Sequence, residues 1–217
     1  MSRTCPHHIG KLTMRQRTWP RATALLLTAG LSLTACGSDS GSGDIKGTHK
    51  DPTPSQSSAG GDRPKFETPG FTMQFDGWTD SDPTKQAILN DGKERERSLH
   101  SALLQDKELD SLKFHSKGAG LYMGKHWVTQ FRDENQTLTG KSRYYDPEVK
   151  LDGKKSAELK YCNDTSKGFT KDLKTKKVDR QPASADDYIL YEHKLELNKQ
   201  GVWQTVDTTE KPGGCKP

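Results

Sequence analysis

A basic segment and a short apolar run stand before a cysteine near the start of this chain, and they decide which residues are left to fold. Three arginines between positions 15 and 21 precede the apolar run 22–33, which leads through two small residues to Cys36. A run of about a dozen apolar residues is shorter than the roughly 20 that cross a bilayer, and it matches the core of a secretion signal. The sequence therefore predicts that residues 1–35 are removed and that only residues from Cys36 onward can contribute to the fold.

The stretch Leu33-Thr34-Ala35-Cys36 resembles the lipobox of bacterial lipoproteins. In that group the cysteine thiol takes a diacylglycerol, and cleavage then leaves the cysteine as the first residue. The resemblance implies lipidation of Cys36 and anchoring at the extracytoplasmic face of the cell membrane. The alternative is an ordinary secreted protein with a stray cysteine. Met14 is an alternative start of translation, since it gives a shorter basic lead-in.

Removal of the signal changes the charge of the chain. Residues 1–35 hold five basic residues and no acidic one, which leaves 34 − 5 = 29 Lys and Arg against 29 Asp and Glu. A basic surplus can indicate nucleic acid or an anionic membrane as partner. Here the surplus belongs to the signal, so we expect no nucleic-acid partner.

The segment 36–64 is predicted to be a lipidated, disordered tether. From 37 to 64 its apolar members are Ile45 and Ala59, too few to offset the entropy lost on ordering the backbone. A flexible coil of this length has a root-mean-square reach of roughly 30 Å, at about 5–6 Å per square root of residue number. The tether can therefore hold a domain clear of the lipid headgroups.

Residues 65–217 have the size of one domain, and the whole chain is only 29% hydrophobic, so a covalent cross-link would help its core. Cys162 and Cys215 are the two cysteines left in an exported chain, and we expect them to form a disulfide. Closing that loop stabilises the fold by about 4 kcal/mol on the chain-entropy estimate. A metal site or a redox pair is disfavoured, because there is no C-x-x-C spacing and no histidine close in sequence.

Helical patterns precede strand patterns in this domain. Asp82-Pro83 is typical of a helix start, and apolar residues follow at near-helical spacing to Gln105, although Gly92 should weaken the middle. The stretch 119–132 fits a second helix, with a strand as the alternative. Alternation of period two then predicts strands over 141–145, 149–151, 157–162 and 188–197, and a turn at 198–201 before a strand over 202–206. The predicted class is α+β, helices followed by an antiparallel sheet.

Three short stretches carry a resemblance to a known family: Tyr161-Cys162-Asn163-Asp164, Gly201-Val202-Trp203 and Gly214-Cys215. They are similar to secreted lipoproteins of actinobacterial type, which resemble the nuclear transport factor 2-like superfamily over about 70–215. The resemblance implies a cone, in which a strongly curved sheet wraps around about three helices, and it implies the Cys162–Cys215 cross-link. Members of the superfamily include isomerases, dehydratases, polyketide cyclases and protein adaptors, so the fold does not choose a function.

Direct signs of chemistry are few. The chain has no G-x-S-x-G, H-E-x-x-H, phosphate-loop or EF-hand pattern, and Gly118-Ala119-Gly120 with Gly124 departs from the dinucleotide fingerprint. We expect no cofactor, no metal and no catalytic residue. His100, His115, His126 and His193 are interpreted as surface or structural. The basic stretch Lys171–Lys177 is interpreted as a solvated face rather than as a docking site. An enzyme of this fold would need an acid–base pair inside the cone. The candidates, provided that they line the cone, are Tyr122, His126, Tyr144, Tyr145, Asp146 and Asp164.

Two hypotheses of function are compatible with these observations. The first is a tethered, non-catalytic binding or adaptor module that engages an envelope protein or a small apolar ligand through the concave side of the sheet. The second is a small-molecule isomerase or dehydratase that uses a buried carboxylate or histidine with a tyrosine. The second requires a pocket with at least two convergent titratable groups.

Overall fold

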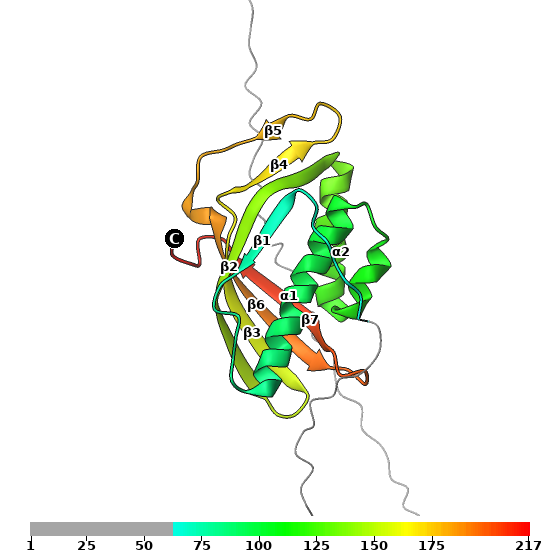
Figure 1. The fold of residues 1–217 in the computed structure, drawn as a ribbon, viewed down its shortest axis with the longest axis vertical. Helices are drawn as coiled ribbons and strands as arrows, with labels where there is room; N and C mark the ends of the chain where they lie inside the picture. Colours follow the sequence, from blue (N-terminus) through cyan, green and yellow to red (C-terminus); the bar gives the residue numbers. More distant parts are fainter. Residues whose placement is uncertain (1–62) are drawn as a thin grey trace, which may run out of the picture. The chain divides into compact units, whose positions relative to one another are not determined.

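Residues 63–217 are described by a computed structural model. The predicted signal 1–35, the alternative start at Met14, the lipidation site Cys36 and the tether up to residue 62 lie outside the described residues. Figure 1 shows the long helices against one face of a strongly curved sheet. The predicted α+β class is confirmed.

The helices and strands alternate little along the chain. The helices are α1 (Pro83–Leu104) and α2 (Gly118–Asp133), with two short 3-10 helices, η1 (Leu109–Phe114) and η2 (Ala185–Asp187). The strands are β1 (Phe71–Phe75), β2 (Gln136–Asp152), β3 (Ser156–Asp164), β4 (Gly168–Asp172), β5 (Val178–Asp179), β6 (Tyr188–Leu197) and β7 (Trp203–Lys211).

The sheet runs in the order β5-β4-β2-β3-β6-β7, and its pairs are antiparallel except for β1. Strand β1 lies beside β2 in parallel, with Phe71 opposite Gly140. Strand β1 precedes α1, whereas the other strands follow the helices as predicted. The predicted strands 141–145 and 149–151 are one strand, β2, which contains an irregularity between Tyr145 and Glu148. A shift of register there bends the strand without ending it.

Helix α1 begins where the sequence predicted. The Asp82 carboxylate accepts hydrogen bonds from the backbone N–H groups of Thr84 (2.8 Å) and Lys85 (3.0 Å), and Pro83 takes the first helical position, where no donor is needed. The stretch 119–132 is helical, and the alternative of a strand is wrong. The turn at 198–201 is confirmed, since Asn198 Oδ1 accepts the N–H of Gln200 at 2.8 Å.

The core lies between the helices and the concave face of the sheet. One buried cluster joins Trp78, α1 and the central strands, and a second joins α1, η1 and α2. Gly92 is where α1 approaches the sheet, because a Cβ there would stand 2.7 Å from Leu159 Cδ2 and 3.2 Å from the Trp78 ring. The expected weak point of the helix is thus a point of close packing.

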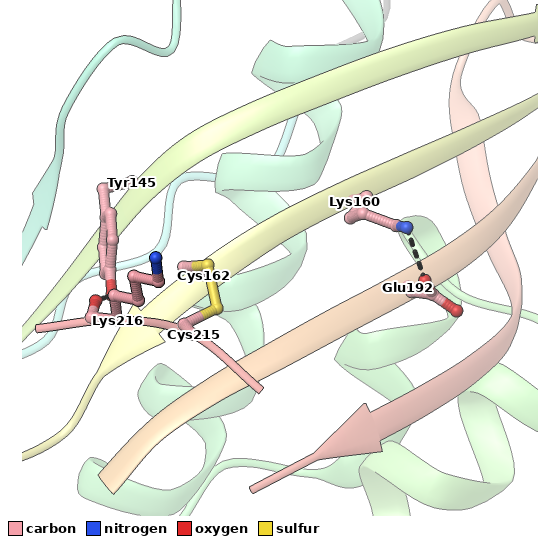
Figure 2. The surroundings of a disulfide bond; sticks show 6 residues. All are labelled: Tyr145, Lys160, Cys162, Glu192, Cys215 and Lys216. Atoms are coloured by element: carbon pink, nitrogen blue, oxygen red, sulfur yellow. Dashed lines mark hydrogen bonds and ion pairs between the residues drawn. A yellow bond between two sulfur atoms is a disulfide. The ribbon is translucent and has the colours of Figure 1, made fainter. Parts of the chain in front are cut away.

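The disulfide Cys162–Cys215 is present, with the Cα atoms 5.9 Å apart. Figure 2 shows how it fastens the C-terminal segment beside β3. Next to it the Tyr145 hydroxyl donates a hydrogen bond to the carbonyl oxygen of Lys216, and the N–H of Cys215 donates to the carbonyl of Tyr188 at 3.2 Å. The cross-link therefore holds the chain end against the face of the sheet that is opposite the helices.

Replacing both cysteines by serine should lower the free energy of unfolding by about 2–4 kcal/mol, because the unfolded chain regains the entropy of a long loop. Urea denaturation followed by tryptophan fluorescence measures this change. Wild-type protein in a strong reductant should unfold at the urea concentration of the double variant. Equal midpoints for the oxidised wild type and the double variant would contradict the expected role of the cross-link.

Candidate functional site

Five polar side chains meet in the interior between α1 and the sheet. Arg95 and Glu96 come from α1, Tyr161 from β3, His193 from β6 and Thr208 from β7. The first four residues are 4%, 6%, 0% and 2% exposed, respectively. They are the titratable cluster that an active site in the cone would need, and we call the five residues the interior ring.

The interior ring is a closed series of hydrogen bonds. Glu96 forms an ion pair with Arg95 and accepts the Tyr161 hydroxyl at 2.8 Å. His193 Nε2 lies 2.7 Å from the Tyr161 oxygen, and His193 Nδ1 lies 2.9 Å from Thr208 Oγ1. Arg95 Nη2 returns to Thr208 Oγ1 at 3.5 Å. Since the one phenol proton goes to Glu96, His193 carries its proton on Nε2 and accepts the Thr208 hydroxyl at Nδ1.

Burial fixes the protonation of the interior ring. Desolvation raises the pKa of Tyr161 well above its usual value, and it lowers the pKa of His193 well below its usual value. For Arg95 burial disfavours the charge, but the adjacent Glu96 carboxylate outweighs it and the pKa is raised. The ring therefore holds a neutral phenol, a neutral imidazole and one ion pair. Neither Tyr161 nor His193 has a pKa near neutrality, where general acid–base catalysis works best.

The acid–base candidates from the sequence are not brought together. Tyr122 is 68% exposed on α2, and its ring stacks on His126 at 6.1 Å between centroids. Tyr144 is fully buried on the concave side, stacked on Phe75, whereas Tyr145 belongs to the opposite face, where it contacts the C-terminal segment. These residues lie on different faces of the fold and share no site.

The two aspartates of that list also serve local structure. Asp146 is exposed, with φ of 48°, at the irregularity of β2. The Asp164 carboxylate accepts the N–H of Ser166 at 2.9 Å and closes the turn between β3 and β4. Neither residue faces the interior ring.

A second buried polar cluster lies nearer the start of the described chain. Asp91 on α1 is 1% exposed and accepts the N–H of Trp203 at 2.8 Å. Its other oxygen forms an ion pair with Arg63, whose guanidinium also donates to the carbonyl of Gly201 at 3.3 Å. His115 stands 3.8 Å from Asp91, is 1% exposed, and neither of its ring nitrogens has a hydrogen-bond partner among the described residues. Arg63 belongs to the stretch predicted as tether, yet it contacts the fold.

The four histidines that were interpreted as surface or structural fall into two groups, buried and exposed. His100, His115 and His193 are buried, while His126 is exposed. His100 Nδ1 lies 2.9 Å from the Glu96 carbonyl oxygen, and the His100 ring stacks on Phe71. Within residues 63–217, no group of three or more His, Cys, Asp or Glu side chains is placed to hold a metal ion.

Glu96, Tyr161 and Thr208 were missing from the sequence-based candidates. A signal for Glu96 existed: it lies seven residues after Leu89 and seven before Leu103, on the stripe of α1 that faces the sheet. A carboxylate at such a position needs a buried partner. No comparable signal identifies which strand supplies that partner.

No protein-family model and no curated protein matches the chain. Solved structures with a similar fold include a ketosteroid isomerase-like protein from Erwinia carotovora atroseptica, at 12% identity and a TM-score of 0.37, covering 54% of this chain and 90% of that one. A protein from Shewanella frigidimarina provisionally assigned as a ketosteroid isomerase has 12% identity and a TM-score of 0.33, over 63% and 99%.

A protein from Catenulispora acidiphila is similar at 8% identity and a TM-score of 0.42, covering 59% of this chain and 93% of that one. All three TM-scores are below 0.5. These likenesses therefore carry no argument about activity.

NMR titration of the ring nitrogens and the phenol should find no protonation change at His193 or Tyr161 between pH 5 and pH 9. The reason is that desolvation moves the pKa of His193 down and that of Tyr161 up, in both cases away from neutrality. A titration of either interior group near pH 7 would instead indicate a working acid–base pair.

The stability of the fold should fall with acidification because of His115. Desolvation first, and then the Arg63 charge, lower the pKa of His115 from its usual 6.5 to about 4. Between these values the unfolded chain holds the proton and the folded chain does not. The contribution of His115 to the free energy of unfolding should therefore fall by about 1.4 kcal/mol per pH unit as pH decreases from about 6.5 towards 4.

The matched variant is His115→Phe, which suits a ring in contact with Phe66 and Phe114. Urea unfolding at pH 7.5, 6 and 5 should give a shallower pH dependence for this variant. His100 and His193 remain in it, and their lowered pKa values contribute with the same sign. Identical slopes for wild type and His115→Phe would show that His115 does not set the acid sensitivity.

Proposed function

We propose that this chain is a lipoprotein, anchored through lipid on Cys36 to the extracytoplasmic face of the cell membrane, that acts as a non-catalytic binding or adaptor module. The proposed membrane location is supported by the order of the basic segment, the apolar run and L-T-A-C in the sequence. Among the described residues, no helix combines the length and apolar character needed to cross a membrane.

The state of the interior ring supports a non-catalytic role. Each of its members is already hydrogen-bonded to another member, and the four with the heaviest burial are at most 6% exposed. A substrate would have to break these bonds to reach Glu96 or His193. The concave side, where the sequence-based hypothesis puts the partner, is filled by the core, with Trp78, Tyr144 and Tyr161 each at most 1% exposed. We therefore propose that partners bind outside the cone.

We further propose that the domain belongs to the nuclear transport factor 2-like superfamily. The support is the architecture itself, in which helices fill the concave side of a strongly curved, largely antiparallel sheet (Figure 1). Resemblance of fold does not select among the activities of that superfamily.

An isomerase or dehydratase is the second candidate, and one observation favours it: a carboxylate, a phenol and an imidazole converge within hydrogen-bonding distance in the interior. It requires these groups to exchange protons near neutral pH. The NMR titration separates the two candidates: the binding module predicts no protonation change at His193 or Tyr161, and the enzyme predicts one near neutral pH.

Mass spectrometry of protein purified from its native membrane should find Cys36 as the first residue, carrying a diacylglycerol. Cys36→Ala removes the thiol and should abolish the lipid. Partner capture from cross-linked membranes should then succeed with wild type and fail with Cys36→Ala, because the variant lacks the membrane address. A native chain that retains residues 22–35, or an unmodified Cys36, would refute the anchored lipoprotein.

A further inference from the structure

The basic charge of the described chain is concentrated on the β4–β5 hairpin, which we define as residues 167–180. The hairpin has two acidic residues, Asp172 and Asp179, and six basic ones: Lys167, Lys171, Lys174, Lys176, Lys177 and Arg180. Its formal charge is +4. Residues 63–217 hold 27 basic and 25 acidic residues, so the remainder has 27 − 6 = 21 basic and 25 − 2 = 23 acidic, a charge of −2.

The lysines of the hairpin differ from those of the neighbouring sheet in their partners. Across the exposed strands Lys160 pairs with Glu192 at 2.7 Å (Figure 2), and a similar pair joins Lys194 to Asp207 at 3.4 Å. None of the five hairpin lysines forms an ion pair with another described residue. Their positive charge is therefore not neutralised within the domain.

The acidic residues of the hairpin accept local hydrogen bonds. The Asp172 carboxylate accepts the N–H groups of Lys174 at 2.9 Å and Thr175 at 2.6 Å, and these bonds lower its pKa. Asp179 accepts the side-chain amide of Gln181 at 2.7 Å. Four of the lysines are exposed, and Lys171 is half-buried. The hairpin presents ammonium groups to solvent on a defined backbone.

The hairpin and the start of the described chain lie at opposite ends of the strands. Asp172 pairs with Gln136 where β2 begins. Arg63 is bonded to Gly201, in the turn between β6 and β7 at the other end, and Figure 1 shows the hairpin at the top and this turn at the bottom. A domain held through the residues before Arg63 thus presents the hairpin on its far side.

Lysine ammonium groups bind phosphate as point charges. An ammonium is a compact point charge, whereas the planar arginine fork favours bidentate partners, and the one arginine of the hairpin lies over the Phe169 ring at 4.9 Å. Several weak contacts to one long polyanion add up, because each contact raises the effective concentration for the next.

We propose that the β4–β5 hairpin binds an extended phosphate-bearing polyanion on the side of the domain that faces away from the anchoring membrane. The direction of display depends on the anchored lipoprotein proposed above, whereas the charge complementarity does not. The hairpin gives the binding module a partner of defined chemistry.

The test compares two fourfold variants with the same change in net charge. The first removes hairpin lysines, as K171Q/K174Q/K176Q/K177Q. The control removes exposed lysines at the opposite end, as K150Q/K154Q/K155Q/K199Q. Each mature chain is reconstituted in phosphatidylcholine vesicles, and binding of inorganic polyphosphate is measured at several salt concentrations.

The hairpin variant should bind polyphosphate at least tenfold more weakly than wild type, and the slope of log affinity against log salt should be smaller by about three. The control variant should stay within twofold of wild type. Equal losses in both variants would show attraction to overall charge alone, and no binding by wild type would reject the hairpin as a polyanion site. Either result overturns the proposal.

A second set of vesicles contains phosphatidylglycerol and tests the direction of display. At 0.15 M salt the field of the lipid surface decays within about 8 Å, so a hairpin on the far side should bind polyphosphate as before. Loss of wild-type binding on these vesicles would place the hairpin on the lipid and overturn the proposal. A chain that does not float with the vesicles would refute the lipid anchor, and the comparison of variants then proceeds on the free protein.

Discussion

The buried ion pair of Arg95 and Glu96 connects the longest helix to three strands. Through Tyr161, His193 and Thr208 the pair is bonded to β3, β6 and β7. Removing one partner of such a pair costs roughly 3–5 kcal/mol, because the other charge is left buried and alone. A shift of α1 by one residue would rotate Glu96 by about 100° away from Tyr161. We infer that the interior ring selects one position of α1 on the sheet.

The same hydrogen bonds occupy the polar atoms of Glu96 and His193. In an acid–base site a carboxylate and an imidazole must be free to exchange protons with a bound molecule. Here Glu96 already accepts two donors, and His193 is bonded at both nitrogens. The ring is a polar part of the core, buried between α1 and the sheet.

Local signals in the sequence predicted a large part of the fold. The Asp82-Pro83 start, the Asn198 turn and the period-two strands involve residues close together in the chain, so their patterns are visible in one sequence. Strand β1 was missed although Phe71, Met73 and Phe75 alternate with polar residues, because a pattern of five residues is short. The pairing of Cys162 with Cys215 was predictable, since only these two cysteines lie in the region predicted to fold. The interior ring was not, because it depends on which strands meet α1, and sequence distance does not reveal that meeting.

Arg63 shows that the folded region begins before the residue that the composition suggests. By composition the ordered region begins at 65, but the guanidinium of Arg63 neutralises Asp91, a carboxylate buried beside the imidazole of His115. A recombinant fragment that begins at Lys65 would lack Arg63 and leave the buried Asp91 carboxylate without its ion-pair partner. A fragment of this domain should therefore begin no later than Arg63, two residues before the start that its hydrophobic pattern suggests.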